Sequence, residues 1–120
     1  MQPSECVFCR IIAGNLPATI YFRDELVTAF QDTHPLAPVH ILVIPNKHLD
    51  SINTAEVEDE ALLGHMLLVA RRMAQEQGID QRGYRLVMNT GRDGGQSVHH
   101  MHLHMLGGAR LRFNFDILEG

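Results

Sequence analysis

The order of apolar and polar residues along the chain predicts two helices of different length. Apolar residues recur at helical spacing between residues 7 and 12, and we expect a short helix there, capped by Ser4 and ended before Gly14. Over residues 61–77, apolar side chains recur at the same period until Gly78. This second stretch predicts one long helix.

Short runs rich in β-branched and aromatic residues predict five strands. They cover residues 19–23, 26–31, 39–44, 84–90 and 98–106. Two polar residues separate the first pair, which favours a hairpin. The third run is nearly continuously apolar, so we expect a central strand buried on both faces. The predicted fold class is therefore α+β, with a five-stranded, mainly antiparallel sheet, one short N-terminal helix and one long helix.

Composition narrows the class of protein. The chain has 120 residues, of which 45% are hydrophobic and 20% charged, and it shows no internal repeat or linker, so we expect one domain over residues 1–120. A net charge of -4 without a basic run disfavours a nucleic-acid polymer as partner. Because no apolar stretch reaches roughly 18 residues and no signal peptide is evident, we expect a cytoplasmic protein without a membrane partner.

Three of the eight histidines alternate near the C-terminus and suggest a phosphate site. In a strand, His100, His102 and His104 would share one face at intervals of roughly 6.5–7 Å, which suits contacts to successive groups of one phosphate ester. The preceding Gly94–Ser97 segment is typical of an anion-binding nest, to which the Gln96 amide and the Ser97 hydroxyl add donors.

Neutral imidazole is a plausible nucleophile toward phosphorus at pH 7, and a phosphohistidine is labile enough to be hydrolysed in a second step without a metal. Two other interpretations remain open. The alternating histidines can form a solvated face, or they can themselves be a zinc site. A further histidine, His40, interrupts the apolar central strand and needs a reason to be there.

The two cysteines, Cys6 and Cys9, form one Cys-x-x-Cys and lie one helical turn apart. This spacing leaves no disulfide framework across the fold, and it leaves metal binding or redox chemistry open. A thioredoxin-like site is disfavoured because no strand precedes the cysteines and no βαβ unit follows them.

The run from Gly95 to Leu106 resembles the signature of the histidine triad family, His-x-His-x-His followed by apolar residues. The resemblance extends through most of the chain, over residues 8, 11–12, 16–18, 29–32, 37–45 and 85–89. The branch that this sequence most resembles is the histidine triad nucleotide-binding proteins, which hydrolyse purine nucleoside phosphoramidates.

The resemblance implies a role for each matching residue. His102 would be the nucleophile, His104 would bind the phosphate and help proton transfer to the leaving amine, and His40 would support the triad, whose first member is His100. Asp32 would bind the ribose hydroxyls. The residues implied around the purine are Val7, Phe8, Ile11 and Phe30, and those near the phosphate are Asn89, Gly95, Gln96, Ser97 and Val98.

The resemblance also implies a metal and a partner. Some family members carry a structural zinc, and the matching positions here are Cys6, Cys9, His48 and His100, a closed tetrahedral donor set. No cofactor would be needed for the chemistry itself. Family members commonly pair through the long helix and a neighbouring strand, so a homodimer is expected.

One departure from the family pattern and three alternatives bear on the function. The tail over residues 110–116 lacks the Trp-Pro-Pro ending of close relatives, which leaves the leaving group open. Hydrolysis of dinucleoside polyphosphates would use the same nucleophile, whereas nucleotidyl transfer is disfavoured because His104 is not replaced by glutamine. From another class of protein comes a nucleotide-binding or partner-binding module without physiological turnover.

Overall fold

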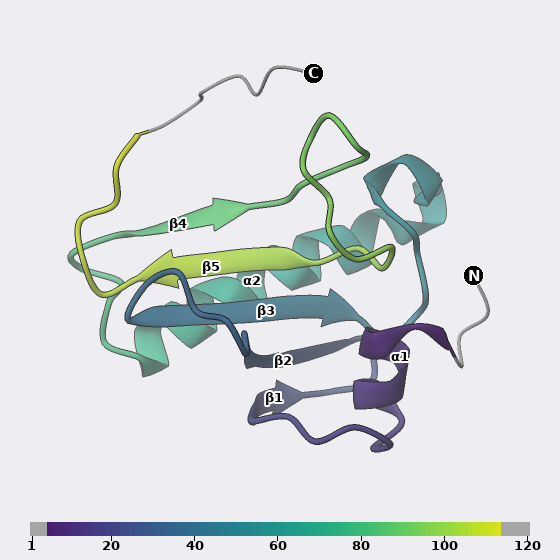
Figure 1. Ribbon diagram of the computed structural model, residues 1–120, viewed down its shortest axis with the longest axis horizontal. Helices are drawn as coiled ribbons and strands as arrows, with labels where there is room; N and C mark the ends of the chain where they lie inside the picture. The colour runs from purple at the N-terminus through teal and green to yellow at the C-terminus, as the bar shows by residue number, and fades with distance from the viewer. Residues whose placement is uncertain (1–4, 114–120) are drawn as a thin grey trace.

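The computed structural model describes residues 5–113, which form one five-stranded antiparallel sheet with helices on its two faces (Figure 1). The elements in chain order are α1 (Val7–Ile12), β1 (Ile20–Arg23), β2 (Val27–Gln31), β3 (Val39–Pro45), the 3-10 helices η2 (Ile52–Thr54) and η3 (Val57–Asp59), α2 (Glu60–Glu76), β4 (Tyr84–Val87) and β5 (Leu103–Gly107). The strand order is β1-β2-β3-β5-β4, and every neighbouring pair is antiparallel. The predicted fold class is confirmed.

The central strand β3 separates two apolar clusters. Its alternating side chains place Ile41 and Val43 in a core with α2, whereas Leu42 and Ile44 pack in a second core with α1. His40 lies on the same side of β3 as Leu42 and is 3% exposed. The prediction of a strand buried on both faces is therefore confirmed, and the histidine in it belongs to the side that carries α1.

The long helix α2 crosses the other face of the sheet, behind the strands in Figure 1. Met66, Val69 and Met73 are buried against the sheet at the predicted helical spacing. The helix ends at Glu76, and Gly78 follows with a φ of +71°, a conformation that favours glycine. Within residues 5–113, no helix is both long and apolar enough to span a bilayer.

The N-terminal helix α1 differs from its prediction in its cap. Ser4 lies outside the described residues, and the N-cap is Cys6, whose Sγ accepts a hydrogen bond from the Cys9 amide at 3.3 Å. A cysteine in this position brings both thiols to the same end of α1. The residue that caps α1 is therefore one of the two cysteines of the Cys-x-x-Cys motif.

The strand predicted over residues 98–106 is wrong at its start, because β5 begins only at Leu103. Upstream of it, the Met101 amide donates to the Leu49 carbonyl at 2.7 Å instead of continuing the ladder with β3. His100 and His102 therefore lie in an irregular segment before the strand. The strand predicted over residues 84–90 likewise ends early, at Val87, where the chain turns into the 91–95 loop.

Candidate functional site

A pocket of about 570 Å³ opens on the α1 side of the sheet and collects most of the predicted nucleotide-binding residues. Of the residues predicted from the sequence, it is lined by Val7, Phe8, Ile11, Phe30, Asp32, His40, Ser97, Val98, His102 and His104. Leu16, Pro17, Thr33, His34, Leu36 and Leu42 complete the lining. Asn89, Gly95, Gln96 and His100 are not among the residues that line it.

Apolar side chains of α1 and β2 form one wall of this pocket. Phe8 packs edge-on against Phe30, with 5.5 Å between ring centroids, and its ring also meets His102 at 5.2 Å. Ile11 is buried beside them. This wall suits a flat, largely apolar group such as a nucleobase, and it stands directly beside the imidazole of His102.

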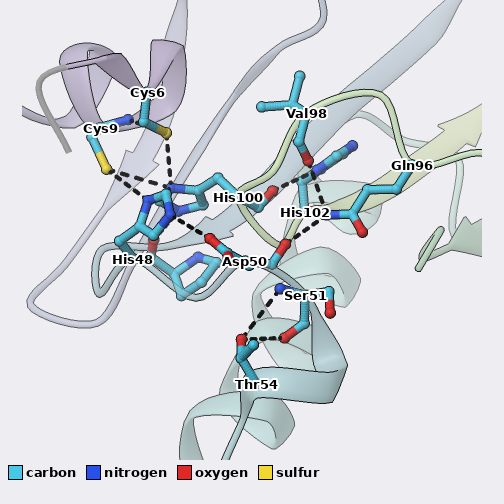
Figure 2. Close-up of polar contacts among 11 residues, drawn as sticks. Cys6, Cys9, His48, Asp50, Ser51, Thr54, Gln96, Val98, His100 and His102 are labelled. Carbon is cyan, nitrogen blue, oxygen red and sulfur yellow. Dashed lines mark hydrogen bonds and ion pairs between the residues drawn. The ribbon is translucent and has the colours of Figure 1, made fainter. Parts of the chain in front are cut away.

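The tautomer of His102 is fixed by a backbone contact. Its Nδ1 lies 2.7 Å from the carbonyl oxygen of His100 (Figure 2). A carbonyl oxygen only accepts, so Nδ1 carries a proton, and in the neutral imidazole Nε2 then keeps its lone pair. His102 is 3% exposed, and its ring lies 5.0 Å from that of His104. In the neutral ring, the side chain thus offers the pocket an oriented nitrogen with a free lone pair.

Asp32, His40 and His104 form a second group, here called the histidine cluster, whose ligand atoms lie within 4.8 Å of one another. The Leu36 amide donates to His40 Nδ1 at 3.1 Å, so the proton of neutral His40 lies on Nε2. That Nε2 is 2.9 Å from Nδ1 of His104 and 3.4 Å from Oδ2 of Asp32. His104 Nδ1 therefore accepts, and its remaining proton lies on Nε2.

Burial keeps both of these imidazoles neutral at pH 7. It lowers the pKa of His104 to about 4, and the neighbouring His102 and His40 act in the same direction. Burial also lowers the pKa of His40, although the charge of Asp32 opposes this shift. The pocket is thus arranged around neutral imidazoles with defined hydrogen positions.

The glycine-rich loop differs from the predicted anion nest in where its donors point. The Gly95 amide donates to the Arg92 carbonyl, and the Gln96 amide donates to the Gly91 carbonyl, each at 3.0 Å. The Gln96 side-chain Nε2 donates to the carbonyls of Asp50 and Val98. These groups hold the loop together, which leaves Ser97 and Val98 to face the pocket.

Cys6, Cys9, His48 and His100 form a separate cysteine cluster at the end of α1, and their ligand atoms also lie within 4.8 Å of one another (Figure 2). His100 Nδ1 lies 3.3 Å from Cys6 Sγ and 3.5 Å from Cys9 Sγ, and His48 Nδ1 lies 3.2 Å from Cys9 Sγ. The prediction that three imidazoles share one strand face is wrong, because the ring of His100 turns toward the cysteines.

The hydrogen-bond partners around the cysteine cluster match those of a metal site. His100 Nε2 donates to the Pro45 carbonyl at 2.8 Å, and His48 Nε2 donates to the Asp50 carboxylate at 2.9 Å. Both Nδ1 atoms then carry lone pairs, yet they face each other at 3.1 Å, which is unfavourable unless a proton or a cation lies between them. These four residues lie close enough together to hold a metal ion, and their atoms are aimed for it.

The electrostatics of the thiols point the same way. Burial, a hydrogen bond from the Cys9 thiol to Cys6 and the charge of Cys6 raise the pKa of Cys9 to about 11. Without a cation, this thiol would keep its proton and bind metals poorly. A bound divalent ion would reverse the balance, because it stabilises the thiolate directly.

Several contacts of the site could not be predicted from the sequence, because backbone groups make them. The Leu36 amide and the carbonyls of Pro45 and His100 fix three histidine tautomers, but they are backbone groups. Two missed side chains did leave a signal. Leu42 is two residues from His40 on the same strand face, and Asp50 is two residues from His48.

Comparison with known proteins agrees with this architecture. A family model described as scavenger mRNA decapping enzyme C-term binding matches residues 5–112. A HIT family hydrolase from Legionella pneumophila Philadelphia 1 superposes with a TM-score of 0.88 at 45% identity, covering 90% of this chain and 96% of that one. A histidine triad protein from Clostridium difficile superposes with a TM-score of 0.90 at 41% identity, covering 97% and 100%. The chain belongs to the histidine triad (HIT) family.

Within that family, the chain is similar to a named enzyme. It is 49% identical over 107 residues to the purine nucleoside phosphoramidase of Escherichia coli (strain K12), covering 89% of this chain and 90% of the relative. The residues matched by the family model, 5–112, include both clusters and all the residues that line the pocket.

Proposed function

We propose that this protein is a hydrolase that cleaves the P–N bond of purine nucleoside phosphoramidates through a nucleotidyl-histidine intermediate on His102. The observation that carries the proposal is the contact between His102 Nδ1 and the His100 carbonyl, because in the neutral imidazole it leaves the lone pair of Nε2 free inside a nucleotide-sized pocket. The similarity to purine nucleoside phosphoramidase supports the choice of substrate.

The substrate would lie with its purine against Phe8, Ile11 and Phe30 and its ribose near Asp32. A carboxylate suits the ribose because it accepts from both hydroxyls of the diol. The phosphorus would then lie between His102 and His104, with Ser97 and Val98 beside its oxygens. In this placement, the substrate contacts the apolar wall, Asp32, the two histidines and the Ser97–Val98 segment at once.

Two displacements at phosphorus would complete the reaction. In the first, His102 Nε2 forms a bond to phosphorus, the P–N bond breaks, and the leaving nitrogen takes up one proton by way of His104 and departs as an amine. In the second, water attacks phosphorus, the bond to His102 breaks, and the proton of the water leaves by the same route. The products are a nucleoside monophosphate and an amine.

The cysteine cluster would hold a structural zinc ion through Cys6, Cys9, His48 and His100. Two thiolates and two imidazoles close a tetrahedral shell without an open position, so the ion would fix α1 to the irregular segment before β5. The reaction itself is carried by the histidines. Reduced thiols also fit the expected cytoplasmic setting. The homodimer stays a prediction from the family resemblance.

Hydrolysis assays with matched substrates test the proposal. Wild-type protein is expected to cleave an adenosine phosphoramidate faster than a diadenosine polyphosphate, and His102→Ala is expected to lower kcat/KM by at least about 10⁴-fold because the nucleophile is lost. Binding of adenosine monophosphate by His102→Ala is the control for an intact pocket. Faster turnover of the diadenosine compound would assign the alternative substrate, and an unchanged rate in His102→Ala would exclude His102 as the nucleophile.

A further inference from the structure

A second, smaller cavity adjoins the nucleotide pocket on the far side of His104. It has a volume of about 300 Å³, and His104 and Leu36 are the two residues that line both spaces. It lies over β4 and β5, on the same sheet face as the histidine cluster, because Val87 pairs with His104 and His104 pairs with Leu42. His104 therefore forms the partition between two compartments.

The residues that line this cavity give it a positive charge. Two arginines, Arg85 of β4 and Arg112 of the segment after β5, line it together with His104, Asn89 and apolar side chains. Another cavity, lined by Arg82 and Arg110, also carries two arginines, but His104 does not line it. The Arg85–Arg112 pair differs in its position next to the histidine cluster. Such a space attracts an anion.

Arg85 is also held in position. Its Nη1 donates to the carbonyl of Arg112 at 2.8 Å, which fixes both the guanidinium and the chain segment that forms the wall. A guanidinium has five N–H donors, and this contact uses one. The remaining donors of Arg85, with the separate charge of Arg112, can bind a carboxylate in the planar geometry that arginine favours.

The chemistry of the displacement places the leaving group in the same direction. A nucleophile and a leaving group lie on opposite sides of the phosphorus that they share. With His102 in the nucleotide pocket and His104 beside the reacting centre, the leaving amine departs toward the smaller cavity. Its volume suits a group of amino-acid size, whereas a second nucleotide needs a space closer to that of the first pocket.

We infer that Arg85 and Arg112 form a subsite for a carboxylate on the leaving amine, so that the protein prefers phosphoramidates of carboxylate-bearing amines. This inference rests on the proposed function and specifies the substrate class of the same site. Arg85 and Arg112 bind the part of the substrate that departs. Neither touches phosphorus in this arrangement, so the subsite sets specificity while His102 carries out the attack.

Two adenosine phosphoramidates that differ only in charge test the inference, one with β-alanine and one with β-alaninamide as the leaving amine. Wild type is expected to cleave the carboxylate compound with a roughly tenfold higher kcat/KM. Arg112→Gln, which keeps the backbone carbonyl that Arg85 binds, and Arg85→Gln are each expected to lower this ratio several-fold. The ratio cancels intrinsic differences between the two amines and any change in folded fraction.

Arg110→Gln is the matched control, since it removes the same charge from a neighbouring residue that lines a different cavity. The inference is overturned if the ratio in wild type is near one, or if Arg110→Gln lowers it as much as Arg112→Gln. It is also overturned if the arginine variants affect diadenosine tetraphosphate more than the β-alanine compound, which would assign the cavity to phosphate. Failure of wild type to cleave either phosphoramidate would instead remove the proposed function on which the inference rests.

Discussion

The ligand atoms of the cysteine cluster and those of the histidine cluster lie within 4.8 Å of one another in each case, but the surroundings of the two clusters differ. In the cysteine cluster, the outer nitrogens of His48 and His100 are bound to a carboxylate and a carbonyl, so every donor aims inward. In the histidine cluster, His104 and Asp32 border an open pocket. The contrast teaches that a closed shell of partners suits holding an ion, whereas a partly open shell suits exchanging a ligand.

The largest expected effect comes from removing the thiols of the cysteine cluster, and it is an effect on stability. Cys6→Ser/Cys9→Ser removes both thiolates, and we expect loss of about one bound zinc per chain and about 3 kcal/mol or more of stability, a fall in Tm of about 15 °C. Metal analysis and calorimetry of protein purified without chelator measure both. His102→Ala is the control and should keep its zinc. Wild-type protein without metal would contradict the zinc site.

The next largest effect is on turnover. His40→Phe keeps an aromatic ring of similar size but removes both nitrogens, so His104 loses the partner that fixes its tautomer. We expect kcat to fall by about 10–100-fold, or about 1.4–2.7 kcal/mol, with unchanged zinc content. His65→Phe, on α2, is the matched control. Equal losses of activity in the two variants would remove the assigned role of His40.

The smallest effect is a dependence of stability on pH. The folded-state pKa values of His40 and His104 are lowered from 6.5, that of His104 to about 4, so the unfolded chain binds more protons between these values. The contribution of these histidines to the free energy of unfolding should therefore be fully present above pH 6.5. As the pH drops toward 4, Tm should fall by a few degrees. His104→Gln should show a shallower decline. A Tm that rises on acidification would reverse the sign and contradict the burial argument.

The sequence allowed much of this molecule to be predicted, for identifiable reasons. The helix over Glu60–Glu76 and the strand over Val39–Pro45 have strong periodicity or long apolar runs, which tertiary contacts do not override. The residues of the cysteine cluster were predicted as a set through the family resemblance, and they lie together here. A pattern that extends over many positions can therefore be recognised from the sequence alone.

The predictions that were wrong concern groups for which several hydrogen-bond partners compete. The alternation of His100, His102 and His104 indicates a strand, but the Met101 amide bonds to Leu49 and the ring of His100 turns to the cysteines. The Gln96 amide was expected at the phosphate, yet two carbonyls take its hydrogens. Such choices depend on groups far apart in the chain, and a local pattern does not contain them.

His100 joins the cysteine cluster to His102 of the pocket, since its ring lies with the cysteines and its carbonyl accepts from His102. Between the two histidines stands only Met101, which is 1% exposed and tied by its amide to Leu49. The spacing between His100 and His102 is therefore fixed. Insertions are tolerable in the exposed turn over residues 91–95, whereas one residue more or less between His100 and His102 would point the His102 ring away from the pocket while leaving the cysteines unchanged.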